Sequence, residues 1–230
     1  MPKFESGSAR SISVEDYLLT IYRLQANEAP VKTMVLAKHL GVTAASISGM
    51  LRKLQRTGLV NHEPYHGVEL TRSGRQQALR LLRRHRLWEL FLHDVLGLSW
   101  DEVHSEAHRL EHATSERVTE GLAAFLGEPS FDPHGQPIPT RDGAVLPRSS
   151  LPLSEIEAGQ TVQVVEVPDG DPATLQYLGE LGLYPGTEVQ VSPASLPEGQ
   201  IELLLGGVGR HLERPIAHRI SVAEVPDSQA

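Results

Sequence analysis

Histidine and glutamate recur at helical spacing in one short segment, VHSEAHRLEHAT, which covers residues 103–114. The positions i, i+4, i+7 and i+8 of this pattern are His104, His108, Glu111 and His112. At about 100° per residue, side chains with this spacing share one edge of a helix. Imidazole and carboxylate groups are ligands for divalent metals, so the segment predicts a helix with a metal-binding edge.

A second segment, LLRRHRLWELFL, repeats the pattern upstream with His85 and Glu89 at i, i+4. The remaining ligands must come from another element, and the acidic residues Glu15 and Asp16 near the N-terminus are natural donors. The chain has no cysteine, so every donor is nitrogen or oxygen. Such a set suits Mn²⁺ or Fe²⁺, although Zn²⁺, Co²⁺ and Ni²⁺ could bind it in vitro.

The sequence pattern of about the first 70 residues predicts three helices and a β-hairpin. The first helix starts near Ser13, with Asp16 completing a capping box, and the second is capped by Thr33 and ends at Gly41. The third covers residues 44–57, and two short apolar runs, 59–63 and 68–71, form the hairpin. This order is typical of a winged helix-turn-helix.

The third helix is the expected recognition helix. Its N-terminal face offers small and hydroxyl side chains that permit close approach to DNA, and basic residues follow for the phosphates. The residues expected to contact DNA are Thr43, Ala45, Ser46, Ser48, Arg52 and Lys53. A helical hairpin used only for packing is the alternative.

Charge is distributed unevenly along the chain, whose net charge is −8. Residues 1–95 hold fourteen Lys/Arg and eight Asp/Glu, whereas residues 96–230 hold seven and twenty-one. A basic DNA-reading region joined to an acidic body fits this asymmetry. No signal-like segment or stretch of about eighteen apolar residues is present, so we expect a soluble, cytoplasmic protein with no membrane partner.

Two long helices, 73–98 and 99–126, are predicted next, the second capped by Ser99. Their apolar surface exceeds what the winged domain can cover, which favours a homodimer. Residues 128–150 contain five prolines and predict a linker or irregular strap. Beyond them, β-like runs at 161–167, 187–192, 200–205 and 216–222, with a helical turn at 177–183, indicate a small β-barrel.

The fold class is therefore α+β and multidomain. We expect a winged helix-turn-helix DNA-binding domain at 1–72, a helical metal-binding and dimerisation domain at 73–140, a linker at 141–150 and a barrel domain at 151–230.

Several motifs together resemble the diphtheria-toxin-repressor family of metal-dependent transcriptional regulators. They are VEDYLLTIY, LAKHLGVTAASISGMLRKLQRTGLV, LTRSGR, RRHRLWELFL, EAHRLEH and the PHGQPIP strap. The C-terminal segment containing ELGLYPGTEVQV is similar to the SH3-like domain of that family and of ferrous-transport accessory proteins. The resemblance implies a metal-loaded homodimer that binds a palindromic double-stranded DNA operator.

The resemblance also implies two metal sites. The primary site would be Asp16, His108, Glu111 and His112, and the ancillary site would be His85, Glu89, His104 and Asp171. Asp16 and His108 stand where iron-sensing members have sulfur-bearing side chains, which favours manganese. Leu19 stands where some manganese sensors have a further carboxylate, so their binuclear arrangement does not transfer. Thr174 stands where an amide is expected, and Asp169 is an alternative to Asp171.

Three other functions compete with a manganese-responsive regulator. An iron-responsive regulator of the same family is one. A hydrolytic metalloenzyme is another, but Glu111 and His112 are adjacent and the H-E-x-x-H spacing of zinc hydrolases is absent, so we expect no enzyme. A metal-independent winged-helix regulator, with the histidines in a small-molecule pocket, is the third.

Overall fold

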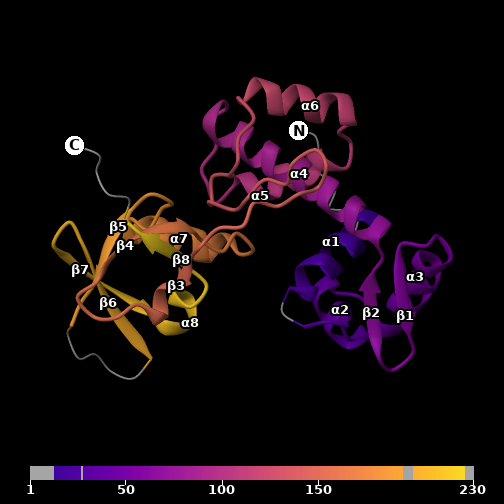
Figure 1. The fold of residues 1–230 in the computed structure, drawn as a ribbon, viewed down its shortest axis with the longest axis horizontal. Coiled ribbons are helices and arrows are strands. Elements are labelled where there is room, and N and C mark those ends of the chain that lie inside the picture. Colours follow the sequence, from indigo (N-terminus) through magenta and orange to yellow (C-terminus); the bar gives the residue numbers. More distant parts are fainter. Residues whose placement is uncertain (1–12, 27, 194–198, 226–230) are drawn as a thin grey trace, which may run out of the picture. The chain divides into compact units, whose positions relative to one another are not determined.

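The computed structural model describes residues 13–26, 28–193 and 199–225, and the chain divides into two compact units (Figure 1). The first unit ends at Leu82 and the second begins at Arg83. The division falls inside one long helix, α4, which spans Arg72–Asp94. Residues 1–12, part of the first predicted domain, lie outside the described residues.

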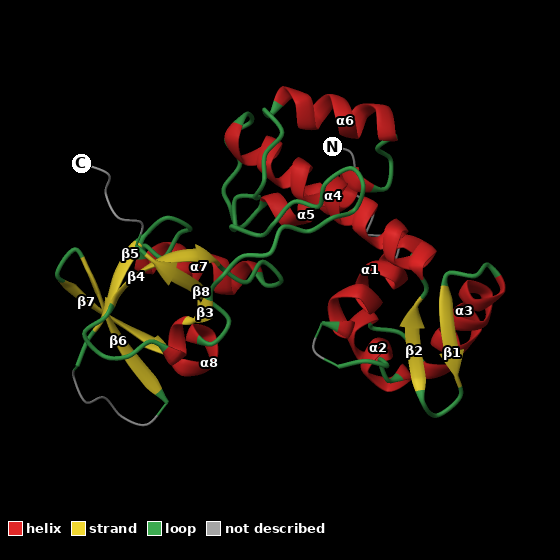
Figure 2. Cartoon of the chain, in the orientation of Figure 1, coloured by secondary structure: helices red, strands yellow, loops and turns green. Residues whose placement is uncertain are grey.

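The first unit consists of three helices and a two-stranded antiparallel hairpin (Figure 2). Its elements are α1 Val14–Gln25, α2 Thr33–Leu40, α3 Ala44–Arg56, β1 Val60–Glu63 and β2 Gly67–Leu70. The apolar faces of the helices meet in one core, whose largest fully buried side chains include Leu18, Ile21, Leu36, Ile47, Leu51 and Leu54. The predicted winged helix-turn-helix is confirmed.

The helix starts in this unit confirm one prediction and correct another. Ser13 Oγ accepts from the Asp16 backbone N–H (3.1 Å), and Asp16 Oδ2 accepts from the Ser13 N–H (2.7 Å), so the capping box of α1 is present. Thr33 does not cap α2, because it is already the first helical residue. Val31 is held extended by two backbone hydrogen bonds to Val68, so the helix begins immediately after Lys32.

Within the described residues, no single helix is both long and apolar enough to cross a membrane. Only α2 and α3 taken together, bent by 107°, satisfy that test of length and composition.

The second unit contains two shorter helices in place of one predicted long helix. They are α5 Val103–Glu111 and α6 Glu116–Phe125. The prediction that Ser99 caps a helix was wrong: its Oγ contacts Glu102 Oε2 and closes a turn, and α5 starts only at Val103.

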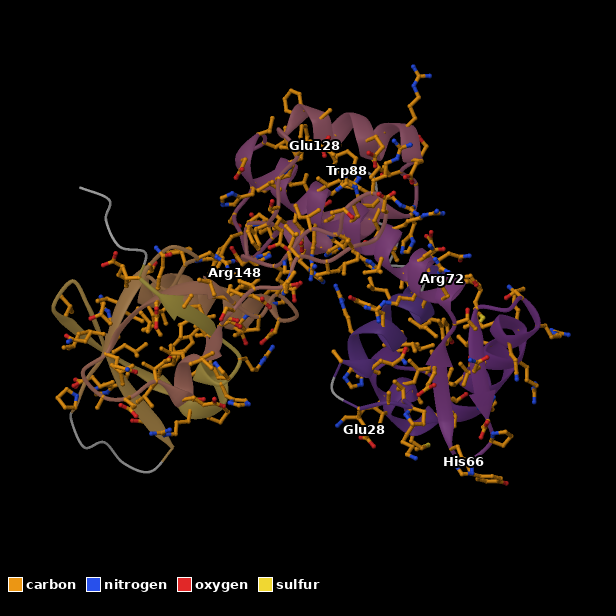
Figure 3. All side chains as sticks on the ribbon, in the orientation of Figure 1. Glu28, His66, Arg72, Trp88, Glu128 and Arg148 are labelled. Carbon is orange, nitrogen blue, oxygen red and sulfur yellow. The ribbon has the colours of Figure 1, made fainter. Side chains whose placement is uncertain are left out.

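A second start signal causes the break between α5 and α6. Ser115 Oγ accepts from the Val118 N–H and caps α6. Just before it, Thr114 Oγ1 accepts a 2.7 Å hydrogen bond from Nε1 of Trp88 on α4 (Trp88 is labelled in Figure 3). Through this contact, the connection between α5 and α6 is held against α4.

Residues 128–150 form an irregular strap that packs against the helices. Phe131 and Pro137 form an isolated antiparallel bridge. Ile138 is buried against Leu87 of α4 and Leu122 of α6. Of the two predicted alternatives, a linker or an irregular strap, the first half of the segment fits the strap, because Ile138 contributes to the helical core.

The C-terminal part is a six-stranded antiparallel sheet in the order β3-β8-β4-β5-β6-β7 (Figure 2). Its elements are β3 Leu151–Pro152, a 3-10 turn at Leu153–Glu155, β4 Thr161–Glu166, α7 Pro172–Leu181, β5 Glu188–Val191, β6 Gln200–Leu205, β7 Val208–Glu213, α8 Arg214–Ala217 and β8 Ser221–Glu224. The predicted small β-domain is confirmed.

Three elements of this sheet domain differ from prediction. Strand β7 was missed because nearly all of its side chains are exposed, which removes the apolar alternation. The run 216–222 is the short helix α8 followed by β8, because Pro215 favours a helical first turn. The turn at 177–183 is the full helix α7, Pro172–Leu181, which is followed by the C-cap residue Gly182, where φ is +81°.

A substitution at Gly74 tests how tightly the first turn of α4 packs against the segment that precedes the hairpin. A Cβ at Gly74 would lie 2.0 Å from the Leu59 carbonyl oxygen, whereas a Cβ at Gly121 in α6 meets nothing within 4 Å. We expect Gly74→Ala to lower the free energy of unfolding by about 1–3 kcal/mol. Gly121→Ala should instead raise it by about 0.5–1 kcal/mol. Urea denaturation followed by circular dichroism measures both, and equal effects would contradict the packing described.

Candidate metal centres and DNA-binding surface

Helices α4 and α5 bring the predicted ligands of the helical region together. His85 and Glu89 lie one turn apart on α4, so they share a face. The α5 segment supplies His104, His108 and Glu111, and His112 follows as its C-cap residue. Glu89 and Glu111 are fully buried, and His85 is only 2% exposed. Buried carboxylates are uncommon unless a positive partner compensates them.

His85, Glu89 and His104 form one cluster, here called the Glu89 cluster. His85 Nε2 and His104 Nδ1 each lie 3.0 Å from Glu89 Oε1, and the two nitrogens are 3.1 Å apart. Ligands about 2.1 Å from one ion lie about 3 Å from each other in octahedral geometry. The three atoms therefore have the mutual spacing of neighbouring ligands of a single cation.

His108, Glu111 and His112 form a second cluster, here called the Glu111 cluster. Nδ1 of His108 lies 2.6 Å and Nε2 of His112 lies 3.3 Å from Glu111 Oε1. One ligand atom from each of the three residues lies within 4.8 Å of the others. The other oxygen of Glu111, Oε2, accepts a 2.7 Å hydrogen bond from His85 Nδ1. His85 therefore joins the two clusters through its two ring nitrogens.

The carboxylates strongly favour a positive charge between them. Burial opposes protonation of His85, but the charge of Glu89 and hydrogen bonds to Glu111 outweigh it and raise the pKa of His85 to about 10. Burial acts to raise the pKa of Glu111, yet hydrogen bonds from His108 and His85 lower it to about 2. Because a metal ligand must be deprotonated, a cation that binds here displaces protons.

The residues of the two clusters fit a divalent cation. All donors are imidazole nitrogens and carboxylate oxygens, the set that suits Mn²⁺ and Fe²⁺. Glu89 Oε2 is buried and has no hydrogen-bond partner among the described residues. A buried carboxylate oxygen without a partner is costly, and a cation would satisfy it.

The two other predicted ligands come from other parts of the chain. Asp16 belongs to α1 of the first unit, where its carboxylate takes part in the capping box. Asp171 is the N-cap of α7 and accepts hydrogen bonds from the backbone of Ala173 and the side chain of Thr174. Its role as a metal ligand stays a prediction. The Thr174 hydroxyl lowers the pKa of Asp171, which is an exposed residue.

Two further ligand-type residues were missed from the sequence. Asp132 and His134, in the strap, are 5% and 0% exposed and lie beside Glu89. Their only sequence signal is the presence of two polar residues in a proline-rich segment between Phe131 and Ile138. That signal has no periodicity, so the helical spacing argument could not detect it.

The predicted DNA-contacting residues lie along α3 and at its N-cap: Thr43, Ala45, Ser46 and Ser48 at the N-terminal end, and Arg52 and Lys53 in the C-terminal half. Thr43 Oγ1 accepts from the Ser46 N–H (3.2 Å) as the helix cap. Ser48 is half-buried, and the exposed members are Thr43, Ala45, Ser46, Arg52 and Lys53. A hollow of about 630 Å³, lined in part by Ser48, Arg52 and Tyr65, separates α3 from the hairpin loop. Residues of α3 and of the hairpin thus line one shared hollow, to which Arg52 contributes a positive charge.

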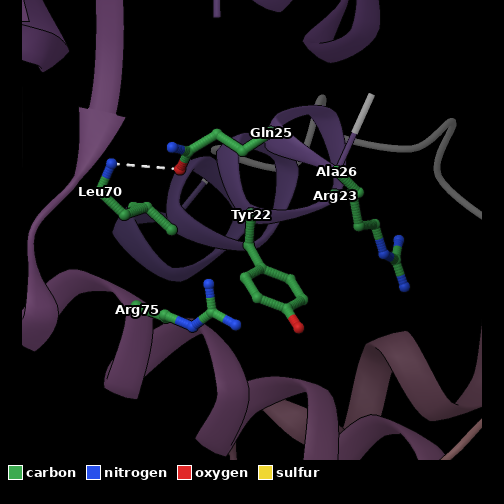
Figure 4. Close-up of a pocket in the computed structure, with 6 residues that line it drawn as sticks. All are labelled: Tyr22, Arg23, Gln25, Ala26, Leu70 and Arg75. Atoms are coloured by element: carbon green, nitrogen blue, oxygen red, sulfur yellow. Dashed lines mark hydrogen bonds between the residues drawn. The ribbon is translucent and has the colours of Figure 1, made fainter. Parts of the chain in front are cut away.

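A separate pocket of about 450 Å³ lies near the C-terminal end of α1 (Figure 4). Gln25 Oε1 accepts a 3.2 Å hydrogen bond from the Leu70 N–H, and the Arg75 guanidinium lies 5.3 Å from the centre of the Tyr22 ring. No histidine is among the described residues that line this pocket. It therefore gives no support to a regulator whose histidines surround a small molecule.

A winged helix-turn-helix joined to a helical body with buried ligand-type side chains is the arrangement expected of a metal-dependent DNA-binding regulator. Three family descriptions match the chain. Residues 11–68 match "Iron dependent repressor, N-terminal DNA binding domain", and residues 71–140 match "Iron dependent repressor, metal binding and dimerisation domain". Residues 151–224 match "FeoA domain".

Full-length relatives agree with these matches. The iron-dependent repressor IdeR of Mycobacterium tuberculosis is 33% identical over 93% of this chain and 97% of its own length. The diphtheria toxin repressor of Corynebacterium glutamicum is 32% identical over 93% and 96%. A solved manganese-dependent transcriptional repressor in complex with manganese is 39% identical, with a TM-score of 0.85 over 93% of this chain and 100% of that one.

The chain therefore belongs to the iron-dependent repressor family, the diphtheria-toxin-repressor family that its motifs resemble. Members of this family are DNA-binding transcriptional repressors and not enzymes, so the hydrolase alternative is excluded.

Glu111 supplies a ligand-type atom to its own cluster and also orients His85. We expect Glu111→Gln to weaken Mn²⁺ binding at least about tenfold, because both effects are lost together. Glu106→Gln is the matched control, since Glu106 lies on the same helix and pairs with Arg109 at the surface. Equilibrium dialysis with Mn²⁺ measures the affinity of each variant. Equal affinities in the two variants would contradict the assignment of Glu111.

Proposed function

We propose that this chain is a manganese-responsive repressor that binds a palindromic operator as a metal-loaded homodimer. The donor chemistry of the two clusters carries the proposal: hard carboxylate oxygens and imidazole nitrogens, with no sulfur, suit manganese. The manganese-bound relative, 39% identical, supports the same ion. An iron-responsive repressor is the second candidate, favoured by the iron-dependent mycobacterial relative of nearly full length. Because the target is double-stranded DNA, we place its activity in the cytoplasm.

The proposed ligands divide into two sites. His85, Glu89 and His104 hold the ancillary ion, and Asp16, His108, Glu111 and His112 hold the primary ion. Once bound, the cation supplies positive charge that fixes these side chains in one arrangement. Glu111 binds the primary ion through one carboxylate oxygen and, through the other, orients His85 toward the ancillary site.

Asp16 is the proposed ligand that connects metal binding at the primary site to the DNA-binding unit. It belongs to the winged unit, whereas the Glu111 cluster belongs to the helical unit. A cation with ligands from both units binds best in one relative arrangement of the two, so metal loading selects that arrangement. In a dimer, this selection sets the spacing of two recognition helices on a palindromic operator.

The homodimer is supported by exposed apolar side chains on the helical body. Phe125 and Val118 of α6 are 68% and 49% exposed, and Leu96, just after α4, is 57% exposed. Apolar surface of this kind suits an interface between two copies of a chain. The matching family description names the same residues a dimerisation domain.

Operator binding measured against metal tests the proposal. A palindromic duplex selected from random DNA should bind about 10- to 100-fold more tightly with Mn²⁺ than with a chelator. Parallel anaerobic titrations with Fe²⁺ and with Zn²⁺ rank the ions by the concentration that gives half-maximal binding. A half-site duplex is the control, since only a dimer gains from two half-sites. Binding that is unaffected by the chelator would favour the metal-independent regulator and contradict the proposal.

The role of Asp16 as a metal ligand is tested by comparing a substitution at Asp16 with one at Ser13, its partner in the capping box. Asp16→Asn removes the carboxylate charge but keeps an oxygen for the capping box, whereas Ser13→Ala weakens the box and leaves Asp16 unchanged. We expect Asp16→Asn to raise the Mn²⁺ concentration for half-maximal operator binding at least about tenfold, with little change for Ser13→Ala. If the Ser13→Ala shift were as large, Asp16 would act only through helix capping.

A further inference from the structure

Asp132 and His134 bring a third set of ligand-type atoms to Glu89, on the side of the strap. The three side chains are 5%, 0% and 0% exposed, respectively for Asp132, His134 and Glu89. One ligand atom from each lies within 4.8 Å of the others. Glu89 comes from α4 and the other two from the strap, so this group joins two segments that are distant in sequence.

The ring of His134 is oriented as in a metal ligand. Its Nε2 lies 2.8 Å from the Trp100 carbonyl oxygen, which can only accept, so Nε2 carries the hydrogen. In the neutral ring, Nδ1 then offers a lone pair in a fully buried position. It has no hydrogen-bond partner in the part of the chain that the structure describes. Metal-bound histidines are commonly fixed by such a carbonyl contact on the opposite nitrogen.

Asp132 is held in place through only one of its oxygens. Oδ1 accepts 2.9 Å hydrogen bonds from the backbone N–H groups of His134 and Gln136. Oδ2 is buried and accepts no hydrogen bond from the described residues. The nearest cation is Arg86, whose Nε lies 3.4 Å from Oδ2 without hydrogen-bond geometry. Arg86 is also engaged by Pro137 O and Gln136 Oε1 of the strap.

Glu89 shows the same division between its oxygens. Oε1 faces His85 and His104 in the Glu89 cluster, and Oε2 is the oxygen that lacks a hydrogen bond. Each residue of the group therefore has one buried polar atom without a hydrogen bond among the described residues: Glu89 Oε2, Asp132 Oδ2 and His134 Nδ1. Unsatisfied buried polar atoms are rare in proteins and call for a cause such as a bound ion.

We propose that Glu89, Asp132 and His134 hold a third divalent cation, next to the ancillary ion, with Glu89 bridging the two. Two carboxylates and one imidazole form an oxygen-rich donor set that suits Mn²⁺ or Fe²⁺. The site shares Glu89 with the proposed ancillary site, but it stands on its own residues Asp132 and His134.

A cation at this position would fasten the strap to α4. The strap in turn holds the sheet domain: the Val167 N–H donates to the His134 carbonyl oxygen at 3.0 Å. Arg148 (labelled in Figure 3) donates to the carbonyl oxygens of Gly135 and Val165. Filling the third site therefore stabilises the contact between the helical region and the sheet domain.

Anomalous diffraction at the manganese edge, on crystals of the full-length protein grown with Mn²⁺ as the only added metal, tests the site. We expect an anomalous peak within bonding distance of His134 Nδ1 and Asp132 Oδ2, separate from a peak at His85 and His104. A peak at His85 and His104 with water or no density beside His134 would overturn the inference and leave the proposed function intact. Absence of every peak would overturn both.

Metal content in solution provides a second readout. After dialysis against Mn²⁺, Asp132→Asn and His134→Gln should each hold one ion fewer per subunit than the unsubstituted protein, by mass spectrometry of the metal. Asp142→Asn and His218→Gln, at exposed positions, are matched controls that should lose none. If one strap variant fails to fold by circular dichroism, the other decides. Equal metal content in folded strap variants and controls would overturn the site.

Discussion

The buried imidazole of His85 between two buried carboxylates is the interaction on which the helical body depends. Its Nε2 faces Glu89 and its Nδ1 faces Glu111, so α4 and α5 are joined through one ring. Two carboxylates without solvent require positive charge nearby, and a proton or a metal ion can supply it. The arrangement of these helices is thus tied to what occupies the space between their side chains.

This constraint connects the fold to regulation. The same α4 that carries His85 begins at Arg72 in the winged unit. The strap, which lies much later in the sequence, also packs against α4. Each segment that meets the ligand region also contributes apolar side chains to a core. Because the core is closely packed, a shift of the ligand side chains displaces the residues packed around them. A regulator of the iron-dependent repressor family needs such a link between metal binding and the arrangement of its DNA-reading elements.

Local patterns in the sequence predicted more than long-range contacts did. The i, i+4 spacing placed His85 with Glu89, and the S-x-x-D pattern placed the cap of α1, because both depend on neighbouring residues alone. The break at Thr114 was missed although Ser115 gives a local start signal for α6; the contact from Trp88 on another helix, which also stabilises the break, leaves no local pattern. Asp132 and His134 were missed because packing of the strap brings them to Glu89, and such packing leaves no periodic pattern in the sequence.

Amide hydrogen exchange, with Mn²⁺ and with a chelator, tests most directly whether a cation binds within the helical body. Ions held between α4 and α5 should slow exchange of amides in residues 83–94 and 103–112, because the ligands on both helices are then fixed together. Exchange in the distant strands β6 and β7 serves as the internal reference. Equal exchange in the two helical segments with and without Mn²⁺, at a concentration that promotes operator binding, would contradict the account.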